Sequence, residues 1–227
     1  SDGDTVLVSA GTYVENINFN GKNIVVQGDD RETTIIDGGQ NGSVVVINSN
    51  ESDQSLIKNF TIINGYGISD YGGGLHIQDA SPILEDLIIE NNIVSGDGGG
   101  ISKSSENSSI HIASSIIRNN TANYAGAVHG LNGSNEIIDC QVYDNHATNI
   151  GGGFGGVMTV SNSSIYNNTA VNGAAAMSAD ATMLNCVVSG NESPNYCIEI
   201  GGGSTEIKNT IIFIGIIPNG FNETRPI

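Results

Sequence analysis

Two histidines and two tyrosines stand at matching places along the chain, and their side chains could exchange protons with a substrate. Tyr71 and Tyr124 each directly precede a triplet of glycine or alanine, and His76 and His129 each follow that triplet at the same distance. Histidine titrates near neutral pH, and tyrosine carries a polar tip on an aromatic body, so the set suits acid–base catalysis or sugar binding. We take His76, His129 and Tyr124 as candidate catalytic residues, with an outward-facing surface row as the alternative.

Acidic side chains gather near the same triplets. Asp70 and Asp97 both lie just ahead of a glycine triplet, and further carboxylates follow at Asp79, Glu85, Asp86 and Glu90. Carboxylate oxygens are preferred ligands of Ca²⁺, although no D-x-D-x-D-G loop occurs. Asp70 and Asp97 are therefore candidate Ca²⁺ ligands, and no other cofactor is expected. The alternative is that these charges only keep the protein in solution.

The overall charge excludes several classes of partner. The 227 residues include 7 Lys and Arg against 24 Asp and Glu, a formal net charge of −17. Proteins that bind nucleic acids or anionic membranes need clustered cations, so neither partner is expected. No apolar run reaches about 18 residues, so this segment is not expected to insert into a membrane. Short runs of Ile and Val can supply a core, which argues against disorder.

The elements that must position these side chains repeat along the sequence. One pattern, an Asn, Asp or Ser followed by an apolar run and then a second Asn, Asp or Gly, recurs at intervals of roughly 23 to 28 residues. The copies begin at Asn59, Asp86, Ser114, Asp139, Asn162, Asn185 and Asn209. Their apolar runs are too short for helices, and the period is too short for propeller blades. It fits one coil of a three-sided parallel β-helix.

Stacked coils predict columns of equivalent side chains about 4.8 Å apart. One column is aliphatic and buried: Ile62, Ile89, Ile117, Val142, Ile165, Val188 and Ile212. Another lies at a turn, where asparagine tolerates a left-handed backbone and its amide can bond its copy in the next coil. We expect this structural ladder to contain Asn64, Asn92, Asn120, Asn145, Asn168 and Asn191.

The three cysteines do not suggest a disulfide scaffold. Cys140 and Cys186 occupy the same repeat position two coils apart, hence about 10 Å from each other. A disulfide requires Cα atoms within about 7 Å, so we predict that these two are not bonded.

The chain is expected to form one parallel β-helix domain over residues 1–227. Residues 1–58 would be irregular N-terminal coils, 59–215 the regular repeats and 216–227 a C-terminal tail, with an exposed loop at 48–55. Open solenoid ends expose strand edges and core residues. We therefore expect the sequence to be a fragment of a longer chain that carries further domains.

The opening segment Gly3–Asn16 resembles the first coil of secreted right-handed parallel β-helix proteins of the pectin-lyase-like superfamily. The later Gly-Gly-Gly-Ile and Ile-x-x-Asn repeats are similar to those of polymorphic outer-membrane proteins and related bacterial surface β-helices. The resemblance implies an all-β, right-handed solenoid of about 8 to 9 coils. It also implies an extracellular or cell-surface location. It does not fix the function, because the superfamily includes lyases, hydrolases, epimerases, tailspikes and non-catalytic adhesins.

Three functions remain open. The first is a non-catalytic module that acts as an adhesin, a spacer or a carbohydrate-binding face, with a polysaccharide or cell-surface glycan as partner. The alternative is a lyase or epimerase of acidic polysaccharides; the resemblance implies that a lyase would need an Arg or Lys base, for which Arg118 is a candidate. The third is a viral tailspike fragment. The motifs typical of hydrolases with this fold are absent, and the repeats are seldom interrupted, which favours the first function.

Overall fold

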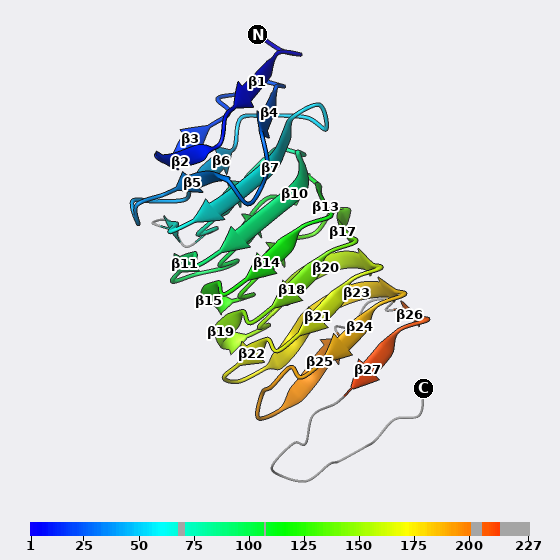
Figure 1. The fold of residues 1–227 in the computed structure, drawn as a ribbon. Coiled ribbons are helices and arrows are strands. Elements are labelled where there is room, and N and C mark those ends of the chain that lie inside the picture. Colours follow the sequence, from blue (N-terminus) through cyan, green and yellow to red (C-terminus); the bar gives the residue numbers. More distant parts are fainter. Residues whose placement is uncertain (68–70, 107, 201–205, 214–227) are drawn as a thin grey trace.

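Short parallel strands coil into a β-solenoid of about eight turns, and the described residues contain no helix. This computed structural model describes residues 1–67, 71–106, 108–200 and 206–213. Figure 1 shows the strands stacked along one axis from the N-terminal to the C-terminal end. The predicted all-β parallel solenoid is therefore confirmed.

The strands form three faces and, in five coils, a small corner sheet; the last described coil contributes β26 to face 1 and β27 to face 2. Face 1 contains β1 (Thr5–Val8), β4 (Val25–Gly28), the first halves of β7 (Leu56–Ile63) and β10 (Ile83–Glu90), β13 (Ile110–Ala113), β17 (Asn135–Ile138), the second halves of β20 (Phe154–Ser161) and β23 (Ala174–Leu184), and β26 (Glu206–Lys208). Face 2 contains β2 (Gly11–Val14), β5 (Thr34–Asp37), the second halves of β7 and β10, β14 (Ile116–Arg118), β18 (Gln141–Tyr143), β21 (Ser164–Tyr166), β24 (Val187–Ser189) and β27 (Ile211–Phe213).

The corner sheet and the third face complete each coil. The corner sheet contains β8 (Tyr66–Gly67), β11 (Ile93–Val94), β15 (Thr121–Tyr124), β19 (His146–Ile150) and β22 (Thr169–Ala170). Face 3 contains β3 (Ile17–Asn18), β6 (Val45–Ile47), β9 (Leu75–Ile77), β12 (Ile101–Lys103), β16 (Val128–Gly130), the first halves of β20 and β23, and β25 (Tyr196–Ile200).

The predicted aliphatic column forms the centre of face 2. Strand pairing joins its members in the predicted order: Ile62, Ile89, Ile117, Val142, Ile165, Val188 and Ile212. The first six are completely buried, and Ile212 is partly buried. Ile or Val recurs at the inward position of each strand, and because successive side chains of a strand point to opposite sides, stacking these strands produces the column.

The asparagine ladder is also present, and it begins at Asn92. Each amide from Asn92 to Asn168 donates from Nδ2 to the Oδ1 of the next asparagine over 2.9–3.0 Å, through Asn120, Asn145 and Asn168 to Asn191. Each backbone N–H from Asn92 to Asn168 donates to that same Oδ1. The amides lie inside the corner and satisfy one another there, which is what burial of polar groups requires.

The prediction that Asn64 belongs to the ladder is wrong. The N–H of Gly65, not of Asn64, donates to Oδ1 of Asn92 over 2.8 Å, so Gly65 occupies the ladder position. Asn64 stands one residue earlier, with a φ of 56°. The same left-handed position holds Asn91, Asn119, Asp144, Asn167 and Gly190. Short polar side chains tolerate that conformation, so asparagine is favoured at two adjacent positions for different reasons.

The corner between face 3 and face 1 varies most in length from coil to coil. The chain between the strands of these faces covers 78–82, then 104–109, then 131–134. In the next two coils it vanishes, because β20 and β23 each run through the corner as one strand. The asparagine bonds from Asn92 to Asn191 repeat unchanged, although β15 and β19 beside them pair with a register shift between Ala122 and Tyr124.

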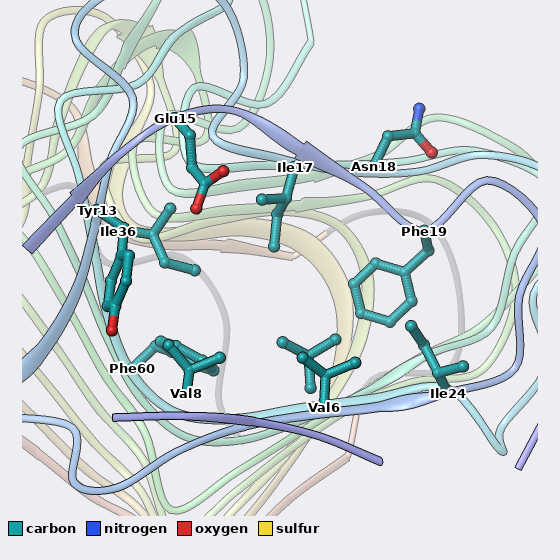
Figure 2. Close-up of a pocket in the computed structure, with 11 residues that line it drawn as sticks. Val6, Val8, Tyr13, Glu15, Ile17, Asn18, Phe19, Ile24, Ile36 and Phe60 are labelled. Carbon is teal, nitrogen blue, oxygen red and sulfur yellow. The ribbon is translucent and has the colours of Figure 1, made fainter. Parts of the chain in front are cut away.

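The N-terminal coil pairs directly with the second, and its outer end is open. Strands β1, β2 and β3 pair with β4, β5 and β6. An apolar cavity of about 210 Å³ remains between the walls of the first coils. Figure 2 shows Val6, Val8, Ile17 and Phe19 around this space. The predicted tail at 216–227 lies outside the described residues.

The loop and cysteine predictions agree with the structure. Residues 48–55 connect β6 to β7 without regular structure, although the carboxylate of Glu51 is buried and accepts N–H bonds from Gly21 and Ser49. Cys140 and Cys186 are both buried free thiols, as predicted. Burial raises the pKa of Cys140 to about 11.

Candidate functional site

Tight turns before face 3 fold one row of side chains over another. Gly72 and Gly98 adopt φ values of 52° and 72°, and a Cβ at either would lie 2.1–2.2 Å from a carbonyl oxygen of the following strand. These turns bring the row Tyr71, Asp97 and Tyr124, joined by parallel bridges, back over face 3. We call these three residues the cover row.

Beneath the cover row, strand register aligns a second row on β9, β12 and β16. Its members are His76, Ser102 and His129, paired in that order, which confirms that the two histidines occupy matching positions of the repeat. The ring of Tyr71 stacks on His76 at 5.7 Å, and Tyr124 meets His129 edge-on at 5.3 Å. The Tyr and His candidates therefore do lie together, and we call this second set the histidine row.

Aspartate, histidine and serine meet at the centre of the two rows. Oδ2 of Asp97 lies 3.7 Å from Nδ1 of His129, beyond hydrogen-bond distance, and Ser102 is on the strand beside His129. These residue types form nucleophilic triads in hydrolases. Here Ser102 is 0% and His129 only 7% exposed, and neither Ser102 Oγ nor His129 Nδ1 has a hydrogen-bond partner. The Ser102 hydroxyl and the His129 ring are thus largely shielded from solvent.

Burial also sets the protonation of the histidine row. It lowers the pKa of His76, and it lowers the pKa of His129 against the opposing effect of Asp97. Both imidazoles are therefore neutral at pH 7. A neutral imidazole can accept a proton, but only from a group that reaches it.

A buried lysine beside this row was not anticipated from the sequence. Lys103 follows Ser102, is completely buried, and donates from Nζ to the carbonyl oxygens of Ser108, over 2.8 Å, and Asn132. Burial lowers its pKa to about 8. The repeat could have revealed this burial, because Lys103 aligns with Ile77, whose side chain points inward. These two carbonyl oxygens belong to the segments that connect face 3 to face 1, and they take the place of a carboxylate partner.

Arg118 lies on face 2, away from the histidine row. Register places it in a row with Glu90, Tyr143 and Tyr166; we call these four residues the arginine–tyrosine row. Nε of Arg118 donates to Glu90 Oε2 over 2.5 Å, and Nη1 donates to the Tyr143 hydroxyl over 2.8 Å. Tyr143 and Tyr166 then stack at 4.6 Å with their planes 7° apart.

These contacts define what Arg118 can do. The hydrogen bonds from Arg118 to Tyr143 and to Glu90 raise the pKa of its guanidinium. A side chain that holds its proton this firmly is unsuited to act as a base. Its side chain is 33% exposed and that of Glu90 19%, so the row faces solvent and can offer hydrogen bonds to a ligand.

The structure places only one of the two candidate Ca²⁺ ligands. Asp70 lies outside the described residues. Asp97 faces His129, and no group of three or more His, Cys, Asp and Glu side chains that could hold a metal ion occurs within the part of the chain that the structure describes.

Among the described residues, no helix has the length and apolar character needed to cross a bilayer. No protein-family model matches the sequence, and no curated protein matches it at a significant level.

Proposed function

We propose that the chain is a non-catalytic module of the cell surface or extracellular space that binds a glycan through the arginine–tyrosine row. In this proposal the solenoid is right-handed and similar to the pectin-lyase-like and bacterial surface β-helices. The observation that carries the proposal is the row itself. Four consecutive coils place a carboxylate, a guanidinium and two phenols in line on an open face.

The chemistry of the row suits sugars. A pyranose has apolar C–H faces and a rim of hydroxyls, and tyrosine offers an apolar ring with a polar tip. Glu90 fixes Arg118, and Arg118 fixes the Tyr143 hydroxyl, so little side-chain freedom is left to lose on binding. The Arg118 guanidinium also lies 5.9 Å from the Tyr143 ring centre, which orients both groups.

The covered histidine row supports a non-catalytic module over an enzyme. A polysaccharide-processing site needs acid and base groups that reach the substrate from one cleft. Here His129 and Ser102 are buried on face 3, while Arg118 lies on face 2. The net charge of −17 favours a neutral glycan over an acidic one.

Glycan-array screening followed by calorimetry tests the proposal. The parent protein should bind at least one neutral oligosaccharide, and Arg118→Ala and Tyr143→Ala should each weaken binding at least tenfold. Tyr71→Ala is the matched control, because this partly exposed tyrosine lies in the cover row over face 3. Failure of the parent to bind any glycan, or equal loss in the control, would overturn the proposal.

A further inference from the structure

The aromatic row on face 2 is interrupted at one coil. Register continues from Tyr166 to Ser189 on β24 and then to Phe213 on β27. Two ring-bearing positions therefore flank a serine, and they lie about 10 Å apart, twice the spacing between coils.

The neighbouring pair shows how rings stand in this row. Tyr143 and Tyr166 are nearly parallel, with centres 4.6 Å apart, so the rings follow the spacing of the coils. Tyr143 has Arg118 in the coil on one side and Tyr166 on the other, whereas Tyr166 has only Ser189 in its next coil. A ring inserted above Ser189 would lie one coil spacing from both Tyr166 and Phe213.

We propose that this gap is a subsite for a single neutral pyranose ring, which inserts between Tyr166 and Phe213 over Ser189. The assignment rests on the proposed glycan-binding function and names the place where the glycan is held. Stacking partners prefer separations of about 4.5 to 7 Å, so the gap accepts one ring and not two.

The surroundings select a sugar over an aromatic ligand. Phe213 is 61% exposed, and Val187, in the same strand as Ser189, is 38% exposed, so apolar surface is available for the C–H faces. Ser189 supplies a hydroxyl at the floor, and the Tyr166 hydroxyl is held by Gln141 Oε1 at 3.4 Å. A pyranose satisfies both kinds of surface, whereas a plain aromatic ring leaves the floor hydroxyl unused.

Filling the gap is the sharpest test. Ser189→Tyr should continue the stack of Tyr143 and Tyr166 and keep the fold, since the added ring can stack on Tyr166. Phe213→Ala should remove the opposite wall. We expect each variant to lower the affinity for the best-bound member of a panel of cellohexaose, chitohexaose and maltohexaose at least tenfold. Ser161→Tyr, on face 1, is the matched control and should bind like the parent.

Two measurements distinguish a failure of the subsite proposal from a failure of the glycan-binding function. If a hexaose binds, Tyr143→Ala weakens it and both subsite variants bind normally, the subsite is wrong while the glycan-binding function stands. If the parent binds neither a hexaose nor any other glycan of the array, the function is wrong, and titration with methyl β-D-glucopyranoside then tests the subsite alone. NMR shifts at Tyr166, Ser189 and Phe213 on titration would support it, and their absence at saturating sugar would overturn it.

Discussion

Asn120 is bonded twice to Asn145, because both its backbone N–H and its side-chain Nδ2 donate to the same Oδ1, over 3.1 and 3.0 Å. Asn145 in turn donates from Nδ2 to Asn168 and to the carbonyl oxygen of Ile117. One side chain therefore ties together consecutive coils at a corner from which water is excluded. Its loss would strand several buried polar groups at once.

Asn145→Ala should lower the free energy of unfolding by at least about 3 kcal/mol, since each stranded buried group costs about 1 to 3 kcal/mol. Urea unfolding followed by circular dichroism measures the change. Asn123→Ala, at an exposed position of the corner sheet, should cost less than about 1 kcal/mol. Equal effects at the two positions would show that the ladder contributes nothing beyond ordinary surface contacts.

Ile165→Asp should prevent stable folding or cost more than about 4 kcal/mol, because it places an unpaired charge in the aliphatic column between Val142 and Val188. The matched change Ile93→Asp falls on a side chain that is 44% exposed and should be tolerated. Thermal unfolding of both variants checks this. A melting temperature of Ile165→Asp equal to that of the parent would contradict the column.

Because Lys103 is buried, the free energy of unfolding should rise with pH at alkaline values. Burial lowers its pKa from 10.5 to about 8, so between these values the unfolded chain binds more protons than the folded one. By linkage, stability then rises with pH across this window, by up to about 3 kcal/mol. The cost of burying the ammonium is fully present below pH 8 and is relieved above 10.5.

Unfolding of Lys103→Met and of the parent at several alkaline pH values isolates this effect. The parent should gain stability relative to the variant as the pH rises. Lys22→Met, which changes an exposed lysine, should keep the parental pH dependence. A Lys103→Met variant with an unchanged profile would show that the buried amine does not titrate in this window.

No β-elimination is expected on pectate or alginate in the presence of Ca²⁺, because Arg118 retains its proton and the histidine row is covered. The ultraviolet absorbance of unsaturated uronate products measures this directly. Turnover by the parent that disappears in Arg118→Ala or His129→Ala would establish the enzyme alternative instead.

The sequence was informative wherever a side chain repeats at an inward position. The column from Ile62 to Ile212 and the ladder from Asn92 onward follow directly from spacing, because stacking forces equivalent residues together. Asn64 was misplaced since two neighbouring turn positions both favour asparagine, one for its backbone conformation and one for its amide. Only the register of Gly65 against Asn92 separates them.

The candidate site was harder to predict, because it depends on how the chain folds over itself. The repeat aligned His76 with His129, but it could not reveal that the turns at Gly72 and Gly98 lay the cover row across them. The burial of Lys103 was missed for a related reason. Lysine is rarely buried, and the carbonyl oxygens that hold its ammonium come from an irregular corner with no repeating pattern.

The corner between faces 3 and 1 gives the molecule a natural place for inserted sequence. Neighbouring coils already differ there, from a segment at 104–109 to the uninterrupted β20, while the ladder opposite stays in register. A peptide grafted into 104–109 or 131–134 would extend outward from the solenoid at a modest loop-closure cost. One residue added beside Asn120 would instead displace every amide bond of that coil. The largest variation between coils therefore falls at this edge, which could display new binding loops while the stacked strands beneath remain unchanged.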